Sequence, residues 1–176
     1  MQRLLILTLL TLTPSALAVP LIGTTQSVND STFCKKYACK LLSSGAYNPA
    51  RDQSRFQGYK QYKYSLSGQG VLEIVRDAKS VVTSASIKFS GTEAFKWAYN
   101  NNGAYTVDFT MAFMGVKPSN SLNNVCLIPV LAENTPPIAS GKMATSAKSI
   151  MTCLAGVKTD QPFPPENAVM ITITLK

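Results

Sequence analysis

The sequence has no histidine among its 176 residues. Without an imidazole the chain cannot form a Ser-His-Asp or Cys-His nucleophile pair, and it lacks a histidine metal ligand or general base. A Ser-Lys dyad needs no histidine, but no S-x-x-K motif occurs, and Ser146-Ala147-Lys148 is better explained as a helix cap beside a solvated lysine. The sequence therefore predicts a protein that is not an enzyme.

Acidic residues are few, because 9 Asp and Glu stand against 17 Lys and Arg, for a formal net charge of +8. A glycosidase requires two carboxyl groups at a set separation. Glu73 and Asp77 are the nearest suggestive pair, but solvent exposure at a strand end and a turn explains them more simply. A carboxylate-dependent cell-wall glycosidase is thus the least favoured function.

Cofactor motifs are missing as well. The cysteines form no C-x-x-C knuckle, which argues against a zinc site. The chain has neither the phosphate-binding loop G-x-x-x-x-G-K-[ST] nor the dinucleotide fingerprint G-x-G-x-x-G between a strand and a helix. We expect no metal, no nucleotide and no other cofactor.

Long apolar runs are absent except near the start, where Arg3 precedes the stretch Leu4–Leu12. This run is too short to span a bilayer, and it is followed by the small-residue sequence Ala16-Leu17-Ala18. A buried helix that stays attached is the alternative. The pattern favours a cleaved signal peptide over residues 1–18, so the mature protein is expected to be secreted or periplasmic and to carry no membrane segment.

A helical pattern begins at Asn29, with Asn29, Asp30 or Ser31 as the N-cap. Its apolar side is formed by Phe33, Cys34, Tyr37, Ala38, Leu41 and Leu42. At about 100° per residue, Cys34 falls near the centre of that side, and Cys39 lies about 140° away. We expect Cys34 to face the core and Cys39 to lie on the opposite, lysine-bearing face.

The four cysteines are Cys34, Cys39, Cys126 and Cys153. An even number in an exported protein usually indicates disulfides. Since Cys34 and Cys39 would lie on different sides of a regular helix, we expect each to pair with Cys126 or Cys153, in an order that the sequence leaves open. A local Cys34–Cys39 bridge is the alternative if the helix breaks between them.

Alternating apolar and polar residues predict strands in the middle and at the end of the chain. Lys60–Leu66 and Val71–Arg76 form an expected hairpin, Asp77–Ser80 a turn, Val81–Phe89 a further strand and Val169–Leu175 the last one.

A second hairpin is predicted around Asn100–Gly103, because Asn-Gly readily supplies the positive φ angles of a tight turn. Its strands would be Phe95–Tyr99 and Tyr105–Phe113. A helix over Thr92–Tyr99 is the rival interpretation, since Thr92 and Glu93 resemble a helix start.

The later part of the chain is expected to hold a second helix, with Ala147, Ile150, Met151, Leu154 and Val157 at helical spacing behind a Thr145 or Ser146 cap. Before it, Val125–Leu131 contains Pro129 and suggests an edge strand or an extended loop. Two proline-bearing stretches, Ala132–Ala144 and Lys158–Asn167, are predicted to be surface loops.

The order of these elements predicts the α+β class. We expect an antiparallel β-meander sheet with an N-terminal and a C-terminal helix packed on one face, stabilised by disulfides. The expected domain organisation is a signal peptide (1–18), an extended segment (19–29) and a single domain (30–176).

Cations and aromatic rings interleave over residues 51–64, a combination that can attract polyanions and stack against rings. The plainer interpretation is that Tyr62 and Tyr64 point into the core while the cations stay solvated. With the helix lysines, the candidate binding residues form a set that we call the basic face: Lys35, Lys36, Lys40, Arg51, Arg55, Lys60 and Lys63.

The leading functional prediction is a non-enzymatic binding or accessory protein whose basic face meets an anionic partner. That partner would be an envelope polymer, a nucleic acid or an acidic protein. The alternative is a secreted inhibitor or protein-interaction module that uses surface loops such as Ala132–Ala144.

Overall fold

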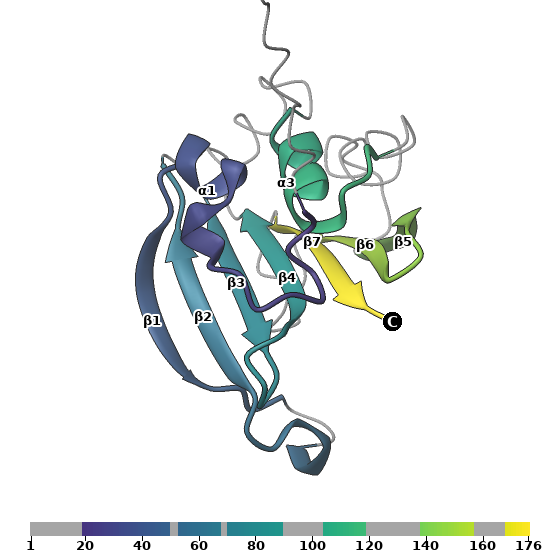
Figure 1. Cartoon of the computed structure of the whole chain (residues 1–176). Coiled ribbons are helices and arrows are strands. Elements are labelled where there is room, and N and C mark those ends of the chain that lie inside the picture. Colours follow the sequence, from purple (N-terminus) through teal and green to yellow (C-terminus); the bar gives the residue numbers. More distant parts are fainter. Residues whose placement is uncertain (1–18, 50–52, 68–69, 90–103, 119–137, 157–167) are drawn as a thin grey trace, which may run out of the picture.

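In the part of the chain that the structure describes, seven antiparallel strands form one sheet in the order β1-β2-β3-β4-β7-β6-β5, with the α-helices α1 and α3 beside it (Figure 1). The computed structural model describes residues 19–49, 53–67, 70–89, 104–118, 138–156 and 168–176. The elements are η1 (Val28–Asp30), α1 (Thr32–Lys36), β1 (Lys40–Ala46), η2 (Gln53–Phe56), β2 (Lys60–Ser65), β3 (Val71–Arg76), β4 (Val82–Phe89), α3 (Ala104–Met114), β5 (Ile138–Thr145), β6 (Ser149–Gly156) and β7 (Ala168–Leu175). The predicted α+β class is confirmed.

Two halves of similar order make up this sheet. The first half is α1 followed by the meander β1–β4, and the second is α3 followed by the meander β5–β7. The last strand of each half lies at the centre, where β4 pairs with β7 over Ser84↔Thr174 to Phe89↔Val169. The pairing of β4 with β7 therefore joins the two halves into one sheet.

The two faces of the sheet differ because side chains alternate along each strand. On one face the core is formed by Leu72, Ile74, Ala85, Ile87, Ile171 and Ile173, all almost completely buried. Both helices cover this face, and the ring of Phe33 on α1 lies 5.1 Å from that of Tyr105 and 5.6 Å from that of Phe109 on α3. Within the described ranges neither α1 nor α3 lies on the other face of the sheet, which we call the open face.

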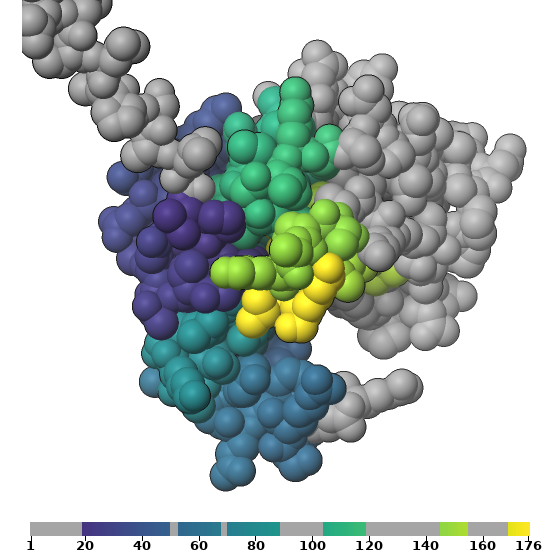
Figure 2. Space-filling view, turned by 45° about the vertical axis from the view of Figure 1, so that its right-hand side comes forward, coloured from purple at the N-terminus to yellow at the C-terminus, as the bar shows by residue number. Residues whose placement is uncertain are grey.

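The first described residues close the core from the side. The backbone N–H groups of Leu21 and Ile22 donate to carbonyls near the end of α3, and Gly23 and Thr24 exchange hydrogen bonds with Val82 at the start of β4. Leu21 and Ile22 are both buried. Figure 2 shows this purple segment packed against the green helix α3. The segment thus links α3 to the sheet.

The predicted helix from Asn29 to Leu42 is wrong in its length. Ser31 is the N-cap, and its side chain accepts from the N–H of Cys34, but α1 ends at Lys36. Ala38 then adopts a positive φ of 48°, and Leu41 and Leu42 lie in the exposed edge strand β1. The helix ends early because β1 gains an antiparallel ladder with β2, interrupted by a bulge between Leu41 and Ser43.

The early end of α1 also corrects the disulfide prediction. Cys34 is bonded to Cys39, with 4.8 Å between their Cα atoms, because the turn at Ala38 brings Cys39 back towards the helix. Cys34 is buried, as expected. Cys153 is also disulfide-bonded, and Cys126 lies outside the described residues. Pairing of Cys34 or Cys39 with Cys126 or Cys153 is therefore wrong, and the local alternative is correct.

The strand predicted over Tyr105–Phe113 is helix α3 instead. Tyr105, Phe109 and Phe113 are spaced by four residues, which places them on one side of a helix but also on one face of a strand. Thr106 and Thr110 are also buried, whereas a strand with one aromatic face would expose them. Long-range packing against α1 and the sheet decides for the helix.

The C-terminal helix predicted behind Thr145 is also wrong, because these residues form strand β6. Ser149, Met151 and Cys153 are buried and Thr152 is exposed, which is a strand pattern. β6 lies between β7 and β5. Among the described elements, the α-helix that packs beside α1 is α3, in the middle of the chain.

The remaining predictions divide into three groups. The strands over Lys60–Leu66, Val71–Arg76, Val81–Phe89 and Val169–Leu175 are confirmed, and so is the turn at Asp77–Ser80. Part of the loop predicted over Ala132–Ala144 is strand β5, and the rest lies outside the described residues. Predictions for Thr92–Tyr99, Phe95–Tyr99, Asn100–Gly103, Val125–Leu131 and Lys158–Asn167 also lie outside the described residues.

A polar contact secures α1 to α3 beside the aromatic cluster. The Tyr37 hydroxyl donates to Asp108 Oδ2 at 2.6 Å, and Lys36 Nζ lies 2.7 Å from the same oxygen. Burial, the hydrogen bond to Asp108 and the charge of that carboxylate raise the pKa of Tyr37 well above its ordinary value.

None of the helices in the described ranges is long and apolar enough to cross a bilayer.

Replacing Gly115 by alanine is expected to destabilise the protein. Gly115 has a φ of +71°, and a Cβ there would lie 2.6 Å from Pro20 Cγ. We expect Gly115→Ala to lower the free energy of unfolding by about 1–3 kcal/mol in urea titrations. The control is Gly45→Ala, where a Cβ meets nothing within 4 Å. Equal stability of the two variants would contradict this packing of the N-terminal segment.

The raised pKa of Tyr37 predicts a loss of stability in alkali. The unfolded chain releases the phenolic proton near pH 10, before the folded chain does, so stability is complete below that pH and declines above it. We expect Tyr37→Phe to lower the free energy of unfolding by about 1–2 kcal/mol at pH 7. Above pH 10 the stability of this variant should decline less steeply than that of the unchanged protein. The check is urea unfolding between pH 7 and 11, and an unchanged decline would disprove the Tyr37 contribution.

Candidate functional site

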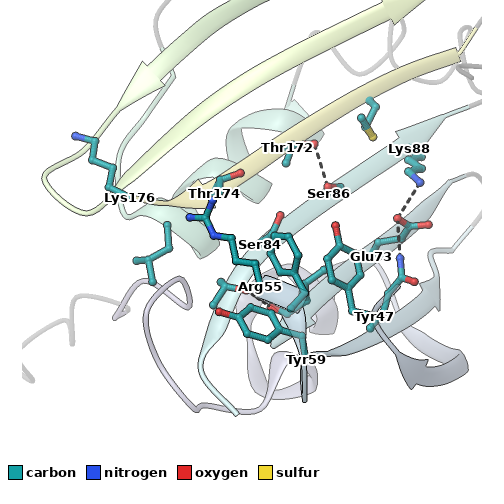
Figure 3. Close-up of a pocket in the computed structure, with 16 residues that line it drawn as sticks. Tyr47, Arg55, Tyr59, Glu73, Ser84, Ser86, Lys88, Thr172, Thr174 and Lys176 are labelled. Atoms are coloured by element: carbon teal, nitrogen blue, oxygen red, sulfur yellow. Dashed lines mark hydrogen bonds and ion pairs between the residues drawn. The ribbon is translucent and has the colours of Figure 1, made fainter. Parts of the chain in front are cut away.

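A groove of about 770 Å³ lies on the open face of the sheet, away from the helices (Figure 3). We call it the open-face groove. Its floor is formed by outward-facing residues of β3, β4 and β7, and one wall by the segment between β1 and β2. The basic side chains that line it are Arg55, Lys88 and Lys176, and the acidic one is Glu73.

Three rings form what we call the aromatic wall: Tyr47, Phe56 and Tyr59. The Phe56 ring lies 5.4 Å from Tyr47 and 5.2 Å from Tyr59, with both pairs at 88°. Backbone hydrogen bonds from Tyr47 N–H to the Tyr59 carbonyl and from Tyr59 N–H to the Phe56 carbonyl hold the segment together. Edge-to-face packing of this kind gives the wall a defined shape.

Arg55 belongs to the same wall, on η2. Its guanidinium lies 6.0 Å from the centre of the Phe56 ring, and the side chain is exposed. Within the described part of the chain, no carboxylate forms an ion pair with Arg55. A cation so placed beside an aromatic ring can meet an anionic group of a ligand.

Hydroxyl groups cover the centre of the floor. Ser84 on β4 lies opposite Thr174 on β7, and Ser86 lies opposite Thr172, so the four side chains form adjacent cross-strand pairs. The hydroxyls of Ser86 and Thr172 are 3.0 Å apart and hydrogen-bonded. Each hydroxyl can both donate and accept, which suits a ligand that carries hydroxyl groups.

One end of the floor carries a charged cluster around Glu73. Its carboxylate lies 2.8 Å from Lys88 Nζ and 3.6 Å from Lys63 Nζ, and it accepts from Gln61 at 3.2 Å. The Glu73 side chain is only 14% exposed. Lys176 lines the opposite end, where its Nζ donates to the Ser146 carbonyl at 2.7 Å. The groove thus has positive side chains at both ends and at the wall.

The seven residues of the basic face lie in several places. Lys35 and Lys36 are in the last turn of α1. Lys40 and Lys60 begin β1 and β2, and the antiparallel ladder places them at opposite ends of that pair. Arg55 lines the groove, and Lys63 is next to it because it is ion-paired with the groove residue Glu73. Arg51 is outside the described residues. The structure therefore brings Arg55 and Lys63 towards the same site.

Sequence reasoning missed several groove residues, among them Lys88, Lys176 and Tyr47. A signal was present for part of the floor, because the polar positions of the predicted strands include Ser84, Ser86 and Lys88. The interleaved aromatic and basic segment likewise contained Arg55, Phe56 and Tyr59. As the plainer interpretation expected, Tyr64 is buried in the core, and Tyr62 packs against it.

The acidic pair considered for glycosidase activity is held by local interactions. Glu73 is ion-paired with two lysines, and Asp77 accepts from the N–H groups of Lys79 and Val81 in the turn before β4. In the described ranges, no group of His, Cys, Asp and Glu side chains is placed to hold a metal ion.

Comparison with known proteins gives no relative from which a function could be transferred. No family model, curated protein or solved structure matches the chain significantly. The function is therefore argued from the geometry of the groove.

Neutralising Glu73 is expected to weaken the charged cluster while keeping its shape. We expect Glu73→Gln to lower the free energy of unfolding by about 1–2 kcal/mol, because Lys88 and Lys63 lose their shared carboxylate; the exposure of Lys63 limits the effect. The measurement is urea unfolding at 20 and 500 mM NaCl, where salt should reduce the difference. Asp30→Asn, which removes the same charge at an exposed site, is the control and should change stability little.

Proposed function

We propose that this protein is a non-enzymatic binding protein that acts outside the cytoplasm and holds an anionic partner in the open-face groove. The observation that carries the proposal is the lining of the groove, in which three basic side chains and one acidic side chain lie along a floor bordered by an aromatic wall. A volume of about 770 Å³ lies in the range of roughly 300–1,000 Å³ that is usual for ligand sites.

The charge of the chain supports an anionic partner. The formal net charge is +8 for the whole chain and +7 once residues 1–18, which include Arg3, are removed, so the mature protein draws anions over the range of a Debye length. The groove offers the local contacts. Arg55 is exposed at the wall, and Lys63 and Lys88 lie close together beside Glu73. Of the basic face, this proposal uses Arg55 and Lys63.

Export is supported by two independent features. The first 18 residues carry the pattern of a cleaved signal peptide, and Cys34, Cys39 and Cys153 are disulfide-bonded. Disulfides persist in oxidising compartments such as the periplasm or the extracellular space. We therefore propose a secreted or periplasmic location, where the anionic partner would be met.

Binding rather than catalysis is proposed because the chain has no histidine, and Glu73 and Asp77 are engaged in local contacts. A general acid or base must reach the proton that it transfers. Two lysines and Gln61 surround the Glu73 carboxylate instead.

Linear polyphosphate of about 20 units tests the proposal, because it carries charge without rings or hydroxyl groups. We expect the mature protein to bind it at 50 mM NaCl in calorimetry, and to bind it several-fold more weakly at 200 mM. In ¹⁵N–¹H spectra the largest shifts should fall on residues 55–61, 84–88 and 172–176.

The decisive comparison uses two double variants of equal charge. Arg55→Gln with Lys88→Gln removes two groove cations and should weaken polyphosphate binding by about tenfold. Lys35→Gln with Lys117→Gln removes two exposed cations on the helix side of the sheet and should weaken it less than about threefold. Thermal melts show that each variant is folded. If both variants lose the same affinity, the overall charge binds the anion and the groove proposal is wrong.

A further inference from the structure

We propose that the ligand of the open-face groove is an anionic oligosaccharide, a short run of sugar rings that bear carboxylate groups. This inference rests on the proposed function and names the chemical class of its ligand. It is carried by three features that lie together: an aromatic wall, a floor of paired hydroxyls, and a small excess of positive charge.

The aromatic wall suits the face of a sugar ring. A pyranose presents C–H groups on its faces and hydroxyls at its rim, so it packs flat against an aromatic side chain while its rim meets polar groups. Tyr59 and Tyr47 each contact Phe56 edge to face, so the three rings hold one another in place. A wall that is already ordered loses little side-chain entropy on binding.

The floor suits the rim of the same sugar ring. Ser84, Ser86, Thr172 and Thr174 are partly or fully accessible on neighbouring strands and project from the same face. Beside them, the Gln61 amide donates one N–H to Glu73, which leaves its carbonyl oxygen to accept from a sugar hydroxyl. This arrangement recognises neutral hydroxyl groups, which polyphosphate and acidic peptides lack.

The charge of the groove is positive but modest. Three basic side chains line it against one carboxylate, and Lys63 adds one more through Glu73. Such a number fits one or a few carboxylates spaced by sugar rings. A nucleic acid strand carries a phosphate at every residue and is usually held by a continuous basic track. In the described part of the groove, the cations instead stand apart, at the two ends and at the wall.

A peptide strand is disfavoured by the position of the groove. Its floor is built on β3, β4 and β7, which are all interior strands with neighbours on both sides. Their backbone N–H and C=O groups are engaged in the sheet, so a peptide cannot add as a further strand there. Recognition in the groove must come from side chains, as sugar recognition does.

The test compares three probes of equal length by calorimetry at 50 mM NaCl. They are trigalacturonate, its fully methyl-esterified form, and the capped peptide triglutamate, which has the same three carboxylates as trigalacturonate but no sugar. We expect trigalacturonate to bind about tenfold or more tightly than triglutamate, because stacking and hydroxyl contacts add to the charge. The esterified sugar should bind about tenfold more weakly than trigalacturonate, because Arg55 loses its partner.

Substitutions at Tyr59 separate the ring contact from charge. Tyr59→Leu should weaken trigalacturonate about tenfold and leave polyphosphate binding unchanged, whereas Tyr59→Phe, which keeps the ring, should retain sugar binding. Tyr62→Leu is the matched control, since Tyr62 packs against the core on the other face of the sheet. Melting curves establish that each variant is folded.

Two results would overturn the inference in different ways. If triglutamate or a thymidine trinucleotide binds as tightly as trigalacturonate, the sugar assignment is wrong while the anion-binding groove stands. If trigalacturonate, triglutamate and polyphosphate all fail to shift the groove resonances, the proposed function fails with it.

Discussion

The antiparallel pairing of β4 with β7 is the interaction on which the rest of the structure depends. It joins two halves, each a helix followed by a meander, and it places Ala85 and Ile87 beside Ile173 and Ile171 at the centre of the core. The same ladder has a second side, where Ser84, Ser86, Thr172 and Thr174 form the floor of the groove. One pairing therefore supplies both the core and the candidate site, because side chains alternate between the two faces of a strand.

The helices and the groove lie on opposite faces of the sheet. Phe33, Tyr105 and Phe109 pack the two helices on one face, and the N-terminal segment fastens α3 to β4. The open face is left with polar floor residues and a wall that projects from the end of the β1–β2 pair (Figure 1). Since the floor residues of the groove do not form the apolar core, their side chains can be polar without loss of core packing.

Local pattern predicted the strands that alternate cleanly and failed where two periods fit the same residues. Tyr105, Phe109 and Phe113 satisfy a strand and a helix alike, and their packing on Phe33 selects the helix. The opposite error occurs at Met151 and Cys153, where the spacing predicts a helix but pairing with β7 makes the segment strand β6. The wrong disulfide prediction followed from the same kind of error, since the helical wheel separates Cys34 from Cys39 only if the helix continues past both of them.

By itself, the sequence determined the α+β class, the four alternating strands, the inward Cys34 and the segment in which Arg55, Phe56 and Tyr59 are gathered. These properties depend on residues close together in the chain, so composition and periodicity are enough to predict them. Only the tertiary structure decided the Cys34–Cys39 bond, the helix at Tyr105–Phe113 and the assembly of the groove. The helix at Tyr105–Phe113 and the groove require segments far apart in sequence to meet, and a local sequence pattern does not carry the energy of such contacts. The Cys34–Cys39 bond joins residues only five apart, but it forms because α1 ends at Lys36, and that end depends on the pairing of β1 with β2.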